Sequence, residues 1–579
     1  MDPNQDAAPS TAKLYIWISV LSQCVSQLDK SCATLVEATL HIDWAVRPRN
    51  FVDVYIDFLE NLVSAHAFYV VPVLNMLVTG MKYRMRLPNY AVVSRSTVYE
   101  RNHEALRCIL QLIPTAASSL FVSIVRLVPH KRFSSADHAA YVKNILEIAE
   151  YVPMLRRQLL GLVIDHMVQV DAHIQIELDE MDDEVEFDIY HMDFDKDYES
   201  DASDDESDED DEDDDSSVSS DIEDDSEDDE RDEKKEEQIQ KVQSMVRKLD
   251  AMMLLTFRYF AKVAINGPSD VRNEIYQTLI DIFDRVILKT LKSRYTQFLI
   301  FYFCSLDANA YSDHFLEHLL LHITDSLRPG ITRIAAAAYM SSYVARAKFL
   351  EPSTIQRIVF VLCGWCETYV DTYEQTVHHL DASKHDVFYA VMQAIMYIFC
   401  FRWRELVIQD DVEAINEEEG EEEPSSMMML SAAGGLSRNW CRGLHNMPRL
   451  IGSRFNPLKV CSPAVVRQFA KIAHQNHFMY VYPILEKNKE LLISGVNATT
   501  GNNITAKNIL QTVQTFFPFD PYKLEGSQSF IDNIYFEWIA DDDDDDDSSD
   551  EEDEEDEDDD VSAGMMAMSI SPSPTHFLQ

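Results

Sequence analysis

Apolar residues recur every three or four positions along most of this 579-residue chain. The series Leu14, Ile18, Leu21, Val25 and Leu28 is one example, and this spacing places an apolar stripe along one face of an α-helix. Prolines separate the periodic blocks, and the alternation that indicates β-strands between Asn-Gly or Asp-Gly turns is absent from the sequence. We therefore expect helices over residues 14–28, 51–63, 105–113, 120–128, 141–149, 155–167, 241–264, 273–286, 295–305, 314–327, 331–349, 354–370, 387–406, 463–474 and 477–490.

Many short helices in series, joined by short loops and without a sheet, predict an all-α chain. We expect a HEAT-type α-solenoid of antiparallel helix pairs, because successive pairs recur at roughly the 40–47 residues of a HEAT unit. No residue pattern repeats strictly along the chain, so an irregular helical bundle is the alternative.

Two segments carry almost all of the formal charge of −51. Residues 177–233 hold 34 acidic and 2 basic side chains, and residues 541–579 hold 18 acidic and no basic side chains. Since like charges this dense repel one another, we expect both segments to be disordered. The rest of the chain is close to neutral, is rich in aliphatic and aromatic residues, and is long enough to bury a core. The acidic segments either screen basic surfaces or only keep the protein in solution.

Changes in composition divide the chain into seven predicted segments. They are a flexible N-terminus at 1–12, N-terminal helical repeats at 13–176, a disordered acidic loop at 177–237, central helical repeats at 238–409, a flexible linker with a short acidic run at 410–440, a C-terminal helical region at 441–540 and a disordered acidic tail with Ser-Pro sites at 541–579. A long acidic loop can connect two helices at little cost in stability, because the entropy cost of closing a loop grows only slowly with its length.

The N-terminus is polar and lacks the apolar core of a signal peptide, and no apolar run reaches about 18 residues without a break. We therefore expect an intracellular protein without a transmembrane helix, in which the nine cysteines are reduced and mostly buried. The sequence contains no evident catalytic triad, phosphate-binding loop or acid pair, so we expect no enzyme activity, small-molecule substrate, cofactor or metal.

A short stretch near the C-terminus combines three aromatic rings with two prolines. It consists of Phe516, Phe517, Pro518, Phe519, Asp520 and Pro521. Each proline fixes its own φ and pushes the residue before it toward extended geometry, which predicts a stiff apolar turn. Such a turn must dock, either on its own domain or on a partner. A second aromatic block follows and ends at Trp538.

These two blocks, together with others in the same order, resemble the TIF-IA family of RNA polymerase I-specific transcription initiation factors. The resemblance covers about residues 14–538. The other blocks are Trp17 with Gln23-Cys24-Val25-Ser26, Asn61-Leu62-Val63-Ser64-Ala65, Leu279-Ile280-Asp281-Ile282-Phe283-Asp284, Phe315-Leu316-Glu317-His318-Leu319, Ala345-Arg346-Ala347-Lys348-Phe349 and Asn456-Pro457-Leu458-Lys459.

This resemblance implies a non-enzymatic HEAT-type adaptor that binds RNA polymerase I near its stalk. The adaptor would bridge the polymerase to the promoter-bound polymerase I selectivity factor at ribosomal RNA genes. The resemblance also implies regulation by protein kinases and a location in the nucleus and nucleolus, with cytoplasmic shuttling left open. Direct DNA binding is expected to be weak or absent, because basic residues are not interleaved with aromatics and two acidic tracts repel phosphate. The sequence does not decide whether the chain forms a homodimer.

The family's polymerase-facing surface includes a serine-rich patch in the N-terminal half. The matching neighbourhood here offers Ser94, Ser96, Thr115, Ser118, Ser119 and Ser123 as candidate polymerase-binding residues. A Ser-Thr-Pro phosphorylation site of some family members is not kept, because this chain reads Pro114-Thr115-Ala116-Ala117. The resemblance therefore does not carry over the kinase that acts on that site.

Serines within acidic segments fit kinases that require carboxylates at the following positions, and two further serines precede prolines. The candidate phosphorylation sites are Ser203, Ser207, Ser220, Ser226, Ser548, Ser549, Ser571 and Ser573. Each phosphate adds about −1.5 to −2 charge, a small change beside a tail that already holds 18 acidic residues, so a switch would work through recognition rather than bulk repulsion.

Three other motifs admit a chemical interpretation beside a structural one. Cys363-Gly364-Trp365-Cys366 has redox or zinc spacing, but it lies in a periodic helical block and has no second ligand pair, which favours two buried thiols. His474 and His477 could ligate a metal, but no partner lies near them in the sequence. The pair His378-His379 is similarly isolated, so ordinary histidines are expected at both places.

Two alternatives come from other functional classes. A HEAT-type nuclear transport receptor is also an acidic α-solenoid, but such receptors carry more repeats in longer chains and are not expected to hold the block at 516–521. An acidic histone chaperone would have tails like residues 541–560, but this interpretation leaves the long helical part of the chain unexplained.

Overall fold

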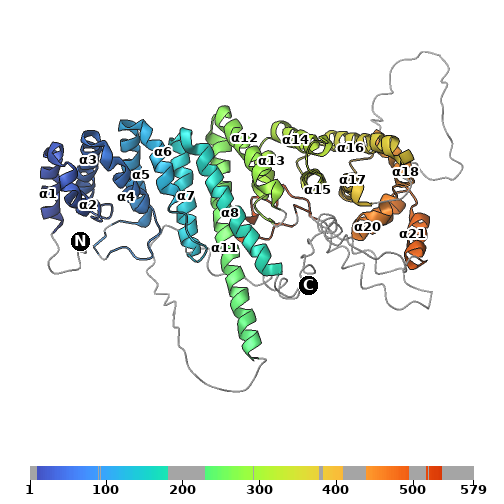
Figure 1. Cartoon of the computed structure of the whole chain (residues 1–579), viewed down its shortest axis with the longest axis horizontal. Coiled ribbons are helices and arrows are strands. Elements are labelled where there is room, and N and C mark those ends of the chain that lie inside the picture. Colours follow the sequence, from blue (N-terminus) through green and yellow to red (C-terminus); the bar gives the residue numbers. More distant parts are fainter. Residues whose placement is uncertain are drawn as a thin grey trace, which may run out of the picture. The chain divides into compact units, whose positions relative to one another are not determined.

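The computed structural model describes residues 10–88, 90–91, 93–179, 229–290, 293–376, 382–408, 439–494, 517–519 and 521–537, and all structural statements concern these (Figure 1). Within this part of the chain there is no β-strand, and only two isolated β-bridges occur, Ala347 with Tyr535 and Val407 with Trp440. The prediction of an all-α fold is therefore confirmed.

The chain forms two compact units, one of residues 1–282 with 523–529 and the other of residues 283–522 with 530–579. The first unit holds α1 (Thr11–Gln23), α2 (Ala33–Leu40), α3 (Arg49–Ala65), α4 (Val70–Thr79), α5 (Arg95–Leu112), α6 (Ala117–Val125), α7 (Ser135–Tyr151), α8 (Arg156–Asp179), α11 (Asp229–Asn266), α23 (Glu525–Gln528) and most of α12 (Ser269–Arg285). The second unit holds α13 (Phe298–Ser305), α14 (Asp313–Thr324), α15 (Gly330–Arg346), α16 (Pro352–Tyr373), α17 (Asp386–Arg402), α18 (Met447–Ile451), α19 (Pro457–Val460), α20 (Pro463–Gln475) and α21 (Tyr482–Ser494).

Prolines begin several of these helices. Pro352 and Pro463 occupy the first position of α16 and α20. Pro114 and Pro153 open the short 3₁₀ turns that lead into α6 and α8. Proline fits there because its φ is already helical and the amide hydrogen it lacks would have no partner within the helix. These four prolines therefore mark helix starts in the fold, whereas Pro72 lies inside the first turn of α4.

In the first unit, helices pack in neighbouring pairs along the chain. Helix α3 packs on α1 and α5, α4 packs on α6, and α7 packs on both α8 and α11. The apolar stripe of α3 is completely covered, since Tyr55, Phe58, Leu59 and Leu62 have no exposed surface. The side chain of Ser134 caps α7 in a capping box with Asp137, which satisfies amide hydrogens at the helix start.

Helices α8 and α11 reach into the segment 177–237 that the sequence predicts to be an acidic loop. Helix α8 continues to Asp179 and α11 begins at Asp229. Residues 180–228 lie outside the described part of the chain, as do the linker residues 409–438 and the tail 541–579.

In the second unit, α15 lies at the centre and packs on α14 and α17, and α17 also packs on α16 and α20. Three consecutive alanines of α15, Ala335, Ala336 and Ala337, are buried. Their small side chains allow neighbouring helices to approach closely, so α15 is enclosed on most of its circumference.

The aromatic turn docks on the second unit, which resolves the choice between its own domain and a partner. Phe517 stacks on Tyr397 with ring centroids 4.6 Å apart. Phe519 is completely buried and its ring contacts Phe298 at 5.4 Å and Phe301 at 5.0 Å. Of the remaining residues in this motif, Phe516, Asp520 and Trp538 lie outside the described residues, and Pro521 is partly exposed.

Hydrogen bonds fix the backbone of this turn. The amide nitrogen of Phe519 donates to the hydroxyl of Ser342 at 3.0 Å, and the hydroxyl of Tyr535 donates to the carbonyl of Phe519 at 2.9 Å. The amide of Gln297 donates to the carbonyl of Pro518 at 2.5 Å. Stiff backbone geometry, buried rings and satisfied polar groups together make this segment part of the core.

Among the described residues, no single helix is both long and apolar enough to cross a membrane. The criterion of length and composition is met only when α5 and residues 114–125 are taken together, and these two elements are bent at 119° to each other.

Candidate interaction surface

Ser94 and Ser96 lie at the amino end of α5. Ser94 is the N-cap, and its exposed hydroxyl accepts a hydrogen bond from the amide of Thr97 at 3.3 Å. Ser96 is partly exposed in the first turn. Free amide hydrogens and the positive end of the helix dipole meet here, so a phosphate added at this position would be electrostatically favoured.

Thr115, Ser118 and Ser119 lie at the opposite end of α5, in the 3₁₀ turn and the first turn of α6. An 18-residue helix is about 27 Å long, so the two groups of hydroxyls are well separated. Thr115 and Ser118 are exposed, and the hydroxyl of Ser118 donates to the carbonyl of Thr115 at 3.2 Å.

Ser123 does not share this exposed surface. Its side chain is buried, and its hydroxyl donates to the carbonyl of Ser119 at 3.1 Å, one turn earlier in α6. The six residues that are near one another in the sequence therefore form two exposed groups and one core position. The spacing of these residues in the sequence could not reveal the separation, because it arises from the length of α5, which lies between the two exposed groups.

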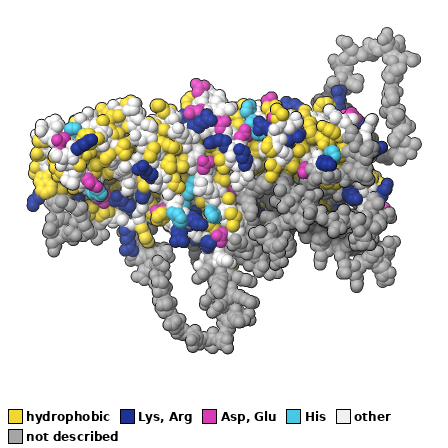
Figure 2. All heavy atoms as spheres, in the orientation of Figure 1, with side chains coloured by type: hydrophobic (Ala, Val, Ile, Leu, Met, Phe, Trp, Pro, Cys, Tyr) yellow, Lys and Arg dark blue, Asp and Glu magenta, His cyan; other side chains and the backbone are white. Residues whose placement is uncertain are grey.

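A basic and aromatic groove lies in the same unit. It encloses about 400 Å³ between the loops that follow α4 and α6, and its lining combines apolar residues and the acidic Asp137 with Lys82, Tyr83, Arg126, His130 and Phe133. Lys82 and Arg126 are exposed, and Arg95, the neighbour of Ser94, stacks on the ring of Tyr83 at 4.7 Å. We call these five lining residues the basic groove. Figure 2 shows dark-blue basic and yellow apolar side chains interspersed over the helices of this unit.

The outer face of α1 is apolar although it is exposed. Ile16, Trp17 and Val20 each expose more than half of their surface, and Tyr15 is also exposed. Exposed apolar residues that gather on one helix mark interaction sites. We call these four residues the α1 face.

The Cys-x-x-Cys motif lies within α16, as the structural interpretation predicted. Cys363 and Cys366 are both buried, and burial raises the pKa of each thiol well above its ordinary value. The thiolate that redox chemistry and metal binding require is therefore disfavoured at both positions.

The two histidine motifs behave differently from each other. His474 packs its ring against Tyr480 at 5.4 Å and Tyr482 at 5.8 Å, and no described acid or cysteine joins it and His477 in a potential metal-binding group. His378 and His379 lie outside the described residues.

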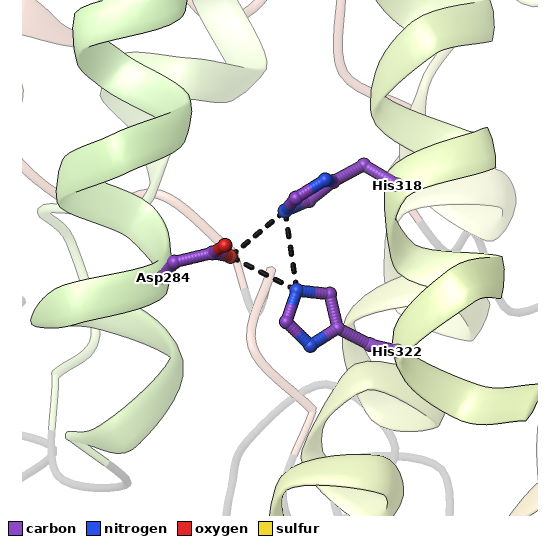
Figure 3. Close-up of side chains that lie close together, drawn as sticks. All are labelled: Asp284, His318 and His322. Carbon is purple, nitrogen blue, oxygen red and sulfur yellow. Dashed lines mark hydrogen bonds and ion pairs between the residues drawn. The ribbon is translucent and has the colours of Figure 1, made fainter. Parts of the chain in front are cut away.

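A cluster that the sequence interpretation did not single out joins α12 and α14. Figure 3 shows His318 and His322 projecting from one helix toward Asp284 on the other. The Oδ1 atom of Asp284 lies 2.8 Å from Nε2 of His318 and 3.0 Å from Nε2 of His322. Burial acts to raise the pKa of Asp284, but the hydrogen bonds from the two histidines lower it below its ordinary value. Histidines four residues apart on a helix were the available signal, but the sequence gives no indication that Asp284 lies beside them.

The sequence matches the family described as RNA polymerase I specific transcription initiation factor RRN3 over residues 1–541. The chain belongs to the RRN3 family. This membership covers both units, and it agrees with the resemblance to the TIF-IA family of polymerase I initiation factors noted in the sequence.

Three curated relatives carry the RRN3 name. The chain is 35% identical to the RNA polymerase I-specific transcription initiation factor rrn3 of Schizosaccharomyces pombe, over 92% of this chain and 80% of that protein. It is 28% identical to the RRN3 factor of Mus musculus, over 90% and 75% of the two chains. It is 26% identical to the RRN3 factor of Saccharomyces cerevisiae, over 92% and 86% of the two chains.

The fold is also that of a solved RRN3-family structure. The crystal structure of RNA polymerase I transcription initiation factor Rrn3 superposes with a TM-score of 0.72, over 93% of this chain and 92% of that chain, at 21% identity. At this identity the likeness establishes the fold, and it supports the α-solenoid over an irregular bundle.

Proposed function

We propose that this chain acts in the initiation of transcription by RNA polymerase I at ribosomal RNA genes. The observation that carries the proposal is the family match across residues 1–541, which includes both helical units. The chain acts as a non-enzymatic adaptor that binds the polymerase near its stalk and bridges it to the promoter-bound selectivity factor. Its site of action is the nucleus and nucleolus.

The polymerase contact involves the first unit in this proposal. Three features support it: the exposed hydroxyls at both ends of α5, the basic groove and the α1 face. They combine hydrogen-bonding groups, positive charge and apolar area, which is the mixture found in protein–protein interfaces. Ser123 contributes through packing only, since it is buried.

Protein kinases control the contact in this proposal. A phosphate on Ser94 or Ser118 would place about −1.5 to −2 charge on a surface that now offers neutral hydroxyls, and would weaken the docking of an acidic partner. The eight serines proposed from the sequence, at 203, 207, 220, 226, 548, 549, 571 and 573, lie outside the described residues.

The proposal is tested by affinity purification of the full chain from growing cells, with mass spectrometry of the partners before and after phosphatase treatment. Recovery of RNA polymerase I subunits, changed by phosphatase, is the expected result. Recovery of transport cargo and a small GTPase, or of histones, without polymerase would contradict it.

Substitutions at each end of α5 then test the two groups of hydroxyl residues individually. Ser94→Glu and Ser118→Glu are expected to lower polymerase recovery, whereas Ser94→Ala and Ser118→Ala retain it. Ser353→Glu, at an exposed serine of α16 in the other unit, is the matched control for an added negative charge. Equal loss in the Ser353 variant would indicate a general charge effect and would exclude the α5 ends as the contact.

A further inference from the structure

The cluster of Asp284, His318 and His322 has the geometry of a metal-ligand set. Each residue presents one ligand atom, and the three atoms all lie within 4.8 Å of one another. Among the described residues, no other group of three histidine, cysteine or acidic side chains brings its ligand atoms this close together. The two ligand nitrogens are of the same type, Nε2, and lie 3.1 Å apart.

The three distances between the ligand atoms, 2.8, 3.0 and 3.1 Å, define a nearly equilateral triangle. Zinc binds histidine nitrogen and carboxylate oxygen at about 2.0–2.2 Å, so the ligand atoms of a tetrahedral site lie about 3.3 Å apart. The observed triangle therefore matches one face of a zinc tetrahedron after an expansion of a few tenths of an ångström. Rotation of side chains alone can supply this expansion.

Burial at the cluster is graded. The side chain of His322 is 2% exposed, that of His318 is 19% exposed and that of Asp284 is 32% exposed. The cluster is thus covered by protein at His322 and accessible to solvent at Asp284 and His318. Three protein ligands with an open fourth position are the usual composition of an accessible zinc site.

Charge also favours a cation at this place. Asp284 lies in the last turn of α12, where the negative end of the helix dipole disfavours a carboxylate. The hydrogen bonds from His318 and His322 meet that charge in part, whereas a divalent ion would compensate it fully.

One neighbour competes with a metal ion. A guanidinium nitrogen of Arg328 lies 2.7 Å from Nδ1 of His322 and donates to it, which leaves the ring proton on Nε2. A metal-bound Nε2 requires this proton on Nδ1 instead, so Arg328 must turn away when the ion binds. Arg328 is part-exposed and also pairs with Asp325 at 3.4 Å, so a second position is available to it.

We propose that Asp284, His318 and His322 bind a divalent transition-metal ion of the zinc type, with water or a further ligand at the fourth position. The ion would join the end of α12 to the middle of α14. Imidazole and carboxylate together suit zinc and its neighbours in the first transition series, whereas calcium and magnesium prefer oxygen ligands alone.

The test uses the full chain, stripped with a chelator and titrated with Co²⁺ under a large excess of Mg²⁺. Mg²⁺ is needed because the acidic segments at 177–233 and 541–579 bind cations without selectivity, and it occupies them. The expected result is one equivalent of Co²⁺ with the intense visible absorption of tetrahedral coordination, which Zn²⁺ abolishes by displacement. Absence of this band, or its removal by Mg²⁺, would overturn the proposal.

Variants locate the ion. His318→Ala and His322→Ala are expected to lose the band, and Asp284→Asn is expected to weaken binding by more than ~10-fold, since even outer-shell substitutions have effects of that size. Arg328→Gln is expected to tighten binding, because it removes the competing donor. His445→Ala, at an exposed histidine of the same unit, is the control and should bind like the parent chain.

Thermal unfolding without metal shows whether each variant is folded. Should the buried His322 variant not fold, the more exposed His318 and the near-isosteric Asp284→Asn still decide the question. Retention of the band in His318→Ala together with unchanged affinity in Asp284→Asn would exclude this site.

Discussion

Arg346 is a charged residue at a completely buried position. Its guanidinium lies over the ring of Phe401 at 4.5 Å and over that of Tyr535 at 5.3 Å, and it donates to the carbonyl of Phe536 at 3.2 Å. The backbone of Arg346 also accepts a hydrogen bond from the amide of Phe536 at 2.7 Å. One residue near the end of α15 therefore holds a segment almost 200 positions later in the chain.

We predict that Arg346→Ala destabilises the protein by about 3 kcal/mol, because it creates a cavity between two rings and removes the donor to the part-buried carbonyl of Phe536. Denaturant unfolding measures this. Arg404→Ala is the matched control, since Arg404 is exposed and stacks only on its neighbour Trp403, and its effect should be within about 0.5 kcal/mol. An equally small effect at Arg346 would contradict the assigned role.

His138 and His166 form a buried pair of stacked histidines in the first unit. Their rings are parallel with centroids 5.0 Å apart, and Nδ1 of His138 lies 2.9 Å from Nε2 of His166. Burial, the neighbouring His166 and the charge of Lys248 lower the pKa of His138 to about 4. Both rings are thus neutral in the folded protein near pH 7.

We predict that stability falls as the pH decreases from about 6.5 to about 4. An unfolded histidine has a pKa near 6.5, so in this window the unfolded chain binds a proton that folded His138 refuses. The stability lost through His138 between pH 6.5 and pH 4 amounts to roughly 3 kcal/mol, and above pH 6.5 the effect vanishes because both states are neutral. Urea unfolding across this range should give a steeper pH dependence for the parent chain than for His138→Gln, and parallel curves would rule the effect out.

At the scale of the element, α1 presents two faces that serve different purposes. Leu14 and Ile18 point into the first unit and are buried, whereas Ile16 and Trp17 face outward. The helical period thus divides neighbouring residues of one short element between core and surface.

We predict that Trp17→Ser changes the unfolding free energy by no more than about 0.5 kcal/mol but lowers recovery of the partner, because the exposed ring gives its apolar area to an interface. Ile18→Ala, on the other face, should cost about 2–5 kcal/mol. Unfolding curves and partner recovery, measured on both variants, separate the two effects. Unchanged recovery with Trp17→Ser would remove the α1 face from the interface.

The aromatic turn is the element whose substitution should damage the second unit most. We predict that Phe519→Ala costs about 3–5 kcal/mol, because the ring is completely buried among Phe298, Phe301 and Tyr343. Tyr480→Ala, at an aromatic residue that is 63% exposed, is the comparison and should have little effect. Calorimetric unfolding of both variants measures the difference, and similar values would show that the turn is not a core element.

Local signals predicted the elements well and their contacts poorly. The apolar period located helices such as 51–63 within α3 and 354–370 within α16, because a stripe that must be buried repeats with the helix itself. The periodic pattern did not single out α2, which has only eight residues, or α4, whose almost entirely apolar sequence hides the helical period. It also placed the start of α11 at Lys241, although the helix begins at Asp229 in a charged stretch whose only apolar residue before Lys241 is Ile239.

Contacts between distant residues depend on the whole molecule and could not be predicted from local pattern. The sequence predicted that the turn at 516–521 docks, but the pockets of Tyr397 and Ser342 that receive Phe517 and Phe519 are assembled by α15 and α17. Similarly, six hydroxyl residues that resemble one patch were separated by the length of α5, and Asp284 was joined to His318 and His322 by helix packing alone.

The C-terminal segment belongs to both compact units. Residues 523–529 complete the first unit, where the side chain of Asp250 in α11 accepts hydrogen bonds from the amide of Gly526 at 2.7 Å and from the hydroxyl of Ser527. Phe519 and Tyr535, on either side, are core residues of the second unit. Each unit therefore contains residues from near the end of the described chain.

This arrangement has a consequence for biogenesis. A ribosome synthesises a chain from its amino end, so helices α1 to α12 emerge long before the residues that complete their unit. The first unit cannot reach its final packing until residue 529 has left the exit tunnel, and the second cannot do so until residue 535 has left it. Chains cut short by premature termination would then leave the aromatic side chains that pack on Phe517 and Phe519 uncovered, a feature that chaperones and proteases recognise, and only full-length molecules would accumulate.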